Sequence, residues 1–138
     1  MMKTQSETIP EDLVPSGEYM SPAQLIFFRQ RLEQERSALL ENTRNTLEEI
    51  RSVDTEPDPS DRASMEEKFS LELRVRNRER KLLGKIEEAL RRIENGTYGW
   101  CMETGEPIGI PRLLARPVAT LCIEAQERHE LMERNHRS

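Results

Sequence analysis

Two prolines interrupt the middle of the chain, in the run Glu56-Pro57-Asp58-Pro59-Ser60. Each proline removes a backbone donor and clashes with the preceding turn, and the residue before it is pushed out of the α region. A helical pattern of apolar residues runs up to this break and resumes directly after it. Two long helices joined by a short turn fold back on each other as an antiparallel hairpin. The sequence therefore predicts a coiled-coil hairpin at residues 21–95, with its tip at residues 54–63.

The composition leaves room for a thin apolar seam but not for a thick globular core. Of the 138 residues, 34% are charged and 35% are hydrophobic, with one Trp, two Tyr and three Phe. Such a composition suits a mainly α protein, a coiled coil with a small appended module. The net charge of −5 argues against nonspecific binding to nucleic acid. No apolar run could span a membrane and the N-terminus has no signal pattern, so we expect a cytoplasmic protein with reduced thiols.

The first twenty residues predict a tail, and the next four predict a helix start. Residues 1–20 carry one Lys against four acidic residues and show no apolar period, which is typical of a flexible acidic segment. In Ser21-Pro22-Ala23-Gln24, Ser takes the N-cap position, Pro the first helical position and Gln the third. We expect a helix over residues 22–53. Its seam, at heptad-like spacing, is predicted to consist of Leu25, Phe28, Leu32, Leu39, Thr43, Leu47 and Ile50.

A second helix is predicted between the proline break and Asn95-Gly96, where the glycine favours a left-handed stop. Ser60 or Asp61 can cap the start of this helix. Its seam is predicted to consist of Phe69, Leu73, Leu83, Ile86, Leu90 and Ile93.

Four basic residues of the second helix fall on one narrow line when plotted at about 100° per residue. We call them the basic line; they are Arg74, Arg78, Lys81 and Lys85. The seam predicted above places this line on the side away from the first helix. The line is either a solvated face or a contact for phosphate groups or an acidic protein surface, since Arg presents a planar fork to phosphate oxygens.

Four of the six glycines, three of the eight prolines and the single Trp lie in residues 96–121, where the charge density falls. Residues 96–121 are therefore predicted to form a small globular module with tight turns. Residues 122–138 are predicted to form a C-terminal helix and tail. The face by which this helix docks is predicted to consist of Ile123, Leu131 and Met132.

The two cysteines have the spacing of two zinc knuckles that have each lost their second ligand. The runs are Cys101-Met-Glu-Thr104 and Cys122-Ile-Glu-Ala125. A closed structural zinc site needs four donors in tetrahedral geometry, and here only two thiolates are supplied. Three interpretations remain: two buried thiols in an ordinarily packed module, a zinc site with His129 as a third ligand, or a redox pair that forms a disulfide.

Five stretches resemble the DksA/TraR family of bacterial transcription regulators, and together they are far more specific than a coiled-coil pattern. They are EPDPSDRA at 56–63, EEKFSLELRVRNRERKL at 66–82, GTYGWC at 96–101, EPIGIPRLLARP at 106–117 and TLCIEA at 120–125. The resemblance implies a coiled coil with a zinc-finger-like module. It also implies a monomer that binds RNA polymerase in its secondary channel without contacting DNA, and that acts with guanosine tetraphosphate on open promoter complexes.

The same resemblance implies roles for particular residues. The tip residues that match the family are Asp58, Asp61 and Ala63. The residues that match its alarmone site, which is shared with polymerase, are Arg78, Lys81, Leu82, Lys85 and Arg116. This chain departs from the family at Thr104 and Ala125, which replace zinc ligands and indicate a zinc-independent branch, and at Gln126, which replaces a basic residue of the alarmone site.

Two other functions compete with this one. The tip carboxylates could hold Mg²⁺ and promote transcript cleavage, as in the similarly shaped Gre factors. Alternatively, the chain could be a purely structural coiled coil, although the polar turn DPSDRA fits that reading poorly.

Overall fold

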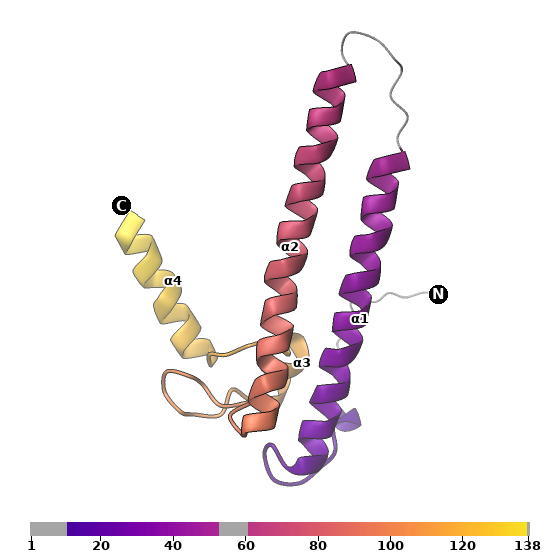
Figure 1. Ribbon diagram of the computed structural model, residues 1–138. Coiled ribbons are helices and arrows are strands. Elements are labelled where there is room, and N and C mark those ends of the chain that lie inside the picture. Colours follow the sequence, from indigo (N-terminus) through magenta and orange to yellow (C-terminus); the bar gives the residue numbers. More distant parts are fainter. Residues whose placement is uncertain (1–10, 53–60, 138) are drawn as a thin grey trace. The chain divides into compact units, whose positions relative to one another are not determined.

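The computed structural model describes residues 11–52 and 61–137, and the described residues are mainly helical (Figure 1). A short 3-10 turn, η1, covers Glu11–Leu13. The helices are α1 (Pro22–Ser52), α2 (Asp61–Asn95), α3 (Ile110–Ala115) and α4 (Ile123–Arg137). The mainly α fold predicted from the sequence is confirmed. Within the described ranges the only β pairing outside helices is an isolated bridge between Trp100 and Pro107, and no helix is long and apolar enough to cross a membrane.

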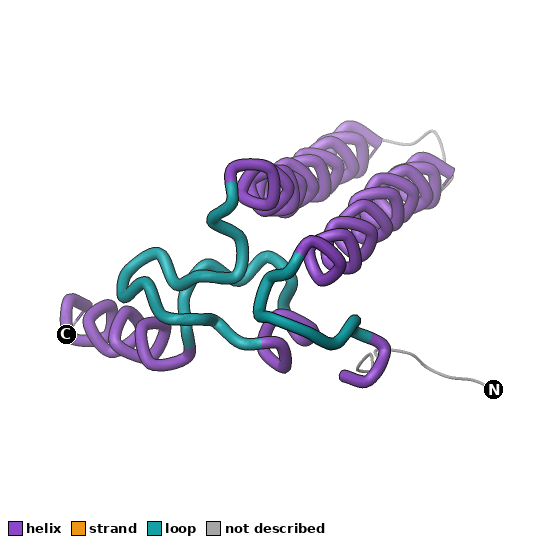
Figure 2. The backbone as a smooth tube through the Cα atoms, turned by 90° about the horizontal axis from the view of Figure 1, so that it is seen from below, coloured by secondary structure: helices purple, strands orange, loops and turns teal. Residues whose placement is uncertain are grey.

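The chain divides into two compact units, and both long helices pass from one to the other. The first unit joins Met1–Leu32 to Glu88–Ser138, and the second is Glu33–Glu87. In the second unit, α1 and α2 lie side by side and antiparallel (Figures 1 and 2). The proline break that separates them lies outside the described residues.

The seam of the second unit is thin and partly polar. From α1 it takes Thr43 and Leu47, which are 8% and 7% exposed, and from α2 it takes Ile86, which is 6% exposed. Beyond these residues, towards the far end of the hairpin, an ion pair joins the two helices. Arg51 donates hydrogen bonds from Nε and Nη2 to the two carboxylate oxygens of Glu72, at 3.2 and 3.0 Å.

The predicted seam of α2 was wrong at Phe69 and Leu73, which are 63% and 45% exposed. The half-buried residues of this stretch include Lys68, Glu72 and Val75. Two heptads before Ile86 the chain has Glu72, which is half-buried. The heptad register of the seam is therefore continuous, but a polar residue fills the seam position at Glu72. Because Arg51 neutralises Glu72, a carboxylate can occupy this position, and the apolar pattern alone could not reveal it.

The start of α1 follows the predicted cap. The backbone N–H of Gln24 donates to Ser21 Oγ at 3.3 Å, and Gln24 Oε1 accepts from the backbone N–H of Met20 at 2.8 Å. These are the reciprocal bonds of a capping box, with the return bond displaced by one residue. Gln24 is 5% exposed and its amide also donates to the carbonyl of Pro15 at 2.9 Å. The cap therefore also fixes the segment that precedes the helix.

The core of the first unit is built from α1, α3 and the loop after α2. Phe28, Leu113 and Tyr98 are at most 1% exposed, and the Tyr98 hydroxyl donates to the carbonyl of Pro117 at 2.8 Å. Burying each such side chain stabilises the fold by about 1.5–3 kcal/mol. The buried Arg92 guanidinium donates to the carbonyl of Trp100 at 3.0 Å, which ties the end of α2 to this loop.

The segment before α1 is held to the first unit by Tyr19. Its hydroxyl accepts a hydrogen bond from the N–H of Gly109 at 2.8 Å and donates to the carbonyl of Gly99 at 2.7 Å. Its ring meets Trp100 edge to face, with the centroids 5.2 Å apart. Gly99 has a φ of +91°, which side-chain-bearing residues rarely adopt, and a Cβ there would lie 2.6 Å from the sulfur of Met20, so a substitution would strain the backbone and displace the Met20 side chain.

The docking face predicted for α4 was also wrong. Ile123, Leu131 and Met132 are 53%, 52% and 68% exposed, whereas Ala125 is fully buried. Helix α4 follows directly from the loops of the module, as Figure 2 shows. Ala125 is the only buried residue among residues 123–136, so the contact of α4 is short and was not visible as an apolar stripe.

Candidate functional site

The basic line is an exposed row of cations on α2, within the second unit. Its four members are all exposed, and in the described part of the chain none of them makes an ion pair. The residues facing α1, such as Val75 and Ile86, lie about 100° around the helix from the line. The line therefore runs along the flank of the hairpin, and the prediction that it faces away from α1 was wrong. A cationic flank without internal partners can bind an anionic group without breaking an existing pair.

The residues matched to the alarmone site divide between the two units. Arg78, Lys81 and Lys85 are exposed on α2, and Leu82 beside them is half-buried on the side of the seam. Arg116 belongs to the first unit, where it is exposed and caps the C-terminus of α3 through its N–H, which donates to the carbonyl of Arg112 at 2.7 Å. The structure thus places four of the five on adjacent turns of one helix.

Gln126, which stands in place of a basic residue of the alarmone site, is uncharged. It lies in the first turn of α4 and is half-buried, and its amide donates to the Glu130 carboxylate at 3.0 Å. An amide already bound to a carboxylate has less capacity to bind a phosphate than a free cation has.

The tip residues are only partly described. Asp58 lies outside the described residues. Asp61 is the first residue of α2 and Ala63 lies in its first turn.

The two cysteines and Thr104 come together in the first unit, which also contains the buried Ala125. Cys101 and Cys122 are 3% and 7% exposed free thiols, and Ala125 is fully buried. The backbone N–H of Thr104 lies 3.5 Å from the Cys101 sulfur, and its hydroxyl lies 3.9 Å from the Cys122 sulfur. Thr104 therefore lies against both sulfurs, and Ala125 offers only a methyl group at its position in the second run.

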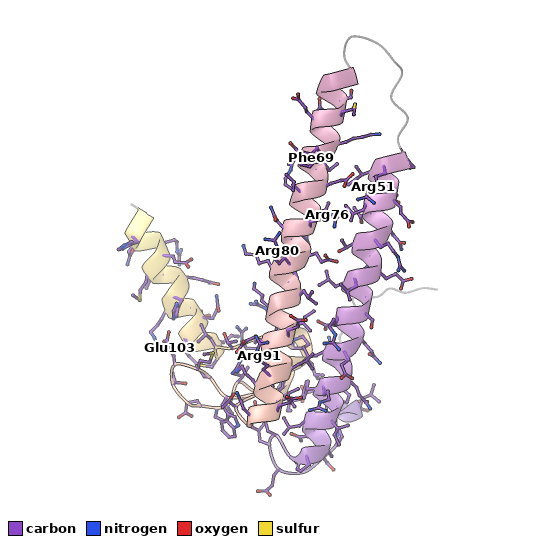
Figure 3. The ribbon with its side chains drawn as sticks, in the orientation of Figure 1. Arg51, Phe69, Arg76, Arg80, Arg91 and Glu103 are labelled. Atoms are coloured by element: carbon purple, nitrogen blue, oxygen red, sulfur yellow. The ribbon has the colours of Figure 1, made fainter. Side chains whose placement is uncertain are left out.

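This donor set does not fit a closed zinc site. A methyl group cannot bind metal, and a neutral hydroxyl is a poor substitute for a thiolate. His129, the possible third ligand, instead contacts the carboxylate of Glu103, which also accepts a hydrogen bond from Arg128 at 3.3 Å (Figure 3 labels Glu103). Among the described residues no group of three or more His, Cys, Asp or Glu side chains could hold a metal ion.

The environment of Cys101 favours its thiolate. Burial acts to raise the pKa of this thiol, but a hydrogen bond from the Thr104 side chain and others from the N–H groups of Cys122, Thr104 and Glu103 outweigh it and lower the pKa from 9.0 to about 6. Backbone donors aimed at a sulfur stabilise its charged form. The negative charge is thus held by the turn itself, with no cation in contact.

Two family profiles match adjacent parts of the chain. Residues 24–93 match the family described as DnaK suppressor protein DksA, N-terminal domain. Residues 96–131 match the prokaryotic dksA/traR C4-type zinc finger. The second match covers the segment in which this chain keeps only two of the four cysteines.

Similar proteins cover most of the chain. The RNA polymerase-binding transcription factor DksA of Caulobacter vibrioides is 50% identical over 120 residues, which are 86% of this chain and 84% of the relative. The protein of the same name from Escherichia coli K12 is 46% identical over 87% of this chain and 80% of its own length. The solved structure of transcription factor DksA2 from Pseudomonas aeruginosa is 48% identical, with a TM-score of 0.74, and the match covers 89% of this chain and 97% of that one. The hairpin with its flanking module and the extent of these matches lead to one conclusion: the chain belongs to the DksA/TraR family.

Proposed function

We propose that this protein is a transcription regulator that binds RNA polymerase by inserting its hairpin into the secondary channel. The observation that carries the proposal is the basic line, a row of exposed cations without ion pairs in the described chain, on a hairpin shared with relatives that are named RNA polymerase-binding transcription factors. The protein would act in the cytoplasm as a monomer and would contact neither DNA nor a membrane. It would work as a binding module and not as an enzyme.

The basic line would also serve the alarmone guanosine tetraphosphate, at a site shared with polymerase. Arg78, Lys81 and Lys85 offer charged donors to phosphate oxygens, and the exposed Arg116 would complete the set. Each charge-assisted hydrogen bond of this kind is worth about 1.5–3 kcal/mol. Leu82 would support the site by packing, because it is half-buried beside the cations.

The tip would act as the effector. Asp58 and Asp61 would present carboxylates to basic or metal-bearing groups inside the polymerase, and Ala63 is the third position of the tip that matches the family. In this proposal the carboxylates act by charge, which falls off slowly with distance, and not by holding a metal for transcript cleavage.

The first unit would fold without zinc. Two buried thiols, the Thr104 hydroxyl and the Ala125 methyl group fill the place that four ligands take in a C4-type finger. The packing of Tyr98, Leu113 and Phe28 supplies the stability that a metal would otherwise supply.

Two measurements on the full chain test the function. Fluorescently labelled protein is titrated with core RNA polymerase, and transcription from a ribosomal promoter is measured in parallel with and without guanosine tetraphosphate. We expect saturable binding, and inhibition that the alarmone enhances. The double change Asp58→Asn and Asp61→Asn should retain binding and lose inhibition. Failure of the unmodified protein to bind polymerase would disprove the proposal, and cleavage of transcripts in stalled complexes would favour a Gre-like activity.

A further inference from the structure

Helix α2 carries a row of large apolar side chains that α1 does not cover. Met65 and Phe69 are each 63% exposed, and Leu73 is 45% exposed. They are four residues apart, so they lie along one face of the helix. Single exposed apolar residues are common on protein surfaces, but a row at helical spacing is the pattern by which one helix docks on another.

The row continues into two arginines and repeats the rhythm of the buried seam. After Leu73 the spacing of three and then four leads to Arg76 and Arg80, and Figure 3 labels Phe69 and both arginines on α2. Each of these five exposed residues comes directly after a half-buried residue in the sequence. The half-buried residues are Ser64, Lys68, Glu72, Val75 and Glu79. One position is a rotation of about 100°. Helix α2 therefore carries a second heptad-spaced face beside the one that α1 covers, and we call it the second face.

The second face is apolar towards the start of α2 and cationic further along. In the described part of the chain, Arg76 and Arg80 make no ion pair. Arg76 interacts by charge with Glu72, but Arg51 already binds both oxygens of that carboxylate. The two arginines are therefore open to carboxylates supplied by a partner.

A second copy of this chain fits the second face poorly. Parallel pairing would set Arg76 against Arg76 and Arg80 against Arg80, which is repulsive. Antiparallel pairing centred on Leu73 would set the apolar Met65 and Phe69 against the arginines. The complementary surface is instead a different helix, with apolar residues three and four positions apart and carboxylates one or two turns further on.

We propose that the second face of α2, formed by Met65, Phe69, Leu73, Arg76 and Arg80, binds an acidic amphipathic helix of RNA polymerase. The identity of the partner rests on the proposed function. The face is separate from the basic line, since Phe69 and Arg78 are about 180° apart around the helix. The hairpin would thus be bound on two sides. The second face would contact an acidic amphipathic helix, and the basic line would contact phosphate or acidic groups.

The test compares variants of the full chain in the titration with core RNA polymerase. Leu73→Gln has a matched control in Leu40→Gln, because Leu40 on α1 is also 45% exposed. We expect Phe69→Gln and Leu73→Gln to weaken binding about tenfold or more, as for central apolar contacts of an interface, and Leu40→Gln to change it less than about twofold. Arg76→Glu should weaken binding most at low salt, where charge repulsion is least screened. Circular dichroism checks that each variant keeps its helicity.

The outcomes separate the two proposals. If the unmodified protein binds and Phe69→Gln and Leu73→Gln bind equally well, the second face is not a docking surface and the proposed function stands. If the unmodified protein does not bind, both proposals fail. If sedimentation shows a dimer that Phe69→Gln dissociates, the face binds a second copy, and the assignment to polymerase is wrong.

Discussion

The hydroxyl of Thr104 lies 3.9 Å from the sulfur of Cys122, which is 18 residues further along the chain. The hydroxyl and the Ala125 methyl group, which is fully buried, occupy positions that a C4-type finger gives to cysteines. The turn at Thr104 is thus held by hydrogen bonds to sulfur and by packing. This relationship makes the dependence of the fold on metal directly testable.

We expect the fold to be indifferent to chelators. Adding EDTA or a stronger zinc chelator should leave the helicity and the melting temperature of the full chain unchanged, because no ligand set is lost. In a four-cysteine finger, metal binding is folding free energy and chelation unfolds the module. The measurement is thermal unfolding by circular dichroism with and without chelator, beside metal analysis of the purified protein. Stoichiometric zinc whose removal unfolds the protein would contradict the expectation.

The lowered pKa of Cys101 should appear as a pH dependence. Thiolate absorbance near 240 nm is expected to rise around pH 6 in the folded protein and only near the ordinary pKa of 9.0 after unfolding in urea. Because the folded pKa lies below the unfolded one, this group's contribution to stability is complete above pH 9 and is lost as the pH falls to about 6. The difference in unfolding free energy between the wild type and Cys101→Ser should therefore grow with pH across this window. A difference that stays constant would show that the thiol is not ionised in the fold.

Replacing Tyr19 by Phe should loosen the segment before α1. The change keeps the ring against Trp100 and removes the hydroxyl that bridges Gly99 and Gly109. Leaving these partners unsatisfied should cost about 1–3 kcal/mol of unfolding free energy, measured by urea denaturation. Gly99→Ala should destabilise the same contact by a different route, since φ at this position is +91° and the added Cβ would displace the Met20 side chain. Unchanged stability in both variants would mean that the segment does not contribute to the fold.

The register of the hairpin seam can be tested by two truncations of the same chemistry. Leu47→Ala removes a side chain that is 7% exposed and should cost about 2–4 kcal/mol. Leu73→Ala removes one that is 45% exposed and should change the stability by less than about 0.5 kcal/mol. Equal costs in urea denaturation would restore Leu73 to the seam.

What the sequence revealed depended on how local the determining interactions are. The cap at Ser21 and the stop at Asn95-Gly96 are local, and the structure has α1 starting at Pro22 and α2 ending at Asn95. The register at Glu72 was missed because it depends on Arg51, a cation on the other helix. The anchoring role of Tyr19 was missed because its partners are 80 and 90 residues away in the sequence. The only local signal for this role is a single Tyr in a polar segment just before a helix, and that signal is weak.

The last prediction separates the alarmone site from general cationic attraction. Arg78→Ala and Lys81→Ala should each reduce the enhancement of inhibition by guanosine tetraphosphate, because each removes a charge-assisted hydrogen bond worth about 1.5–3 kcal/mol. Arg44→Ala is the matched control, since Arg44 is exposed on α1 of the same unit and lies outside the basic line. The readout is the ratio of inhibition with and without the alarmone at a ribosomal promoter, with polymerase binding measured in parallel. Equal ratios for the wild type and both line variants would remove these residues from the alarmone site. A loss as large in Arg44→Ala would show that net charge, and not the position of the cations on α2, governs the response.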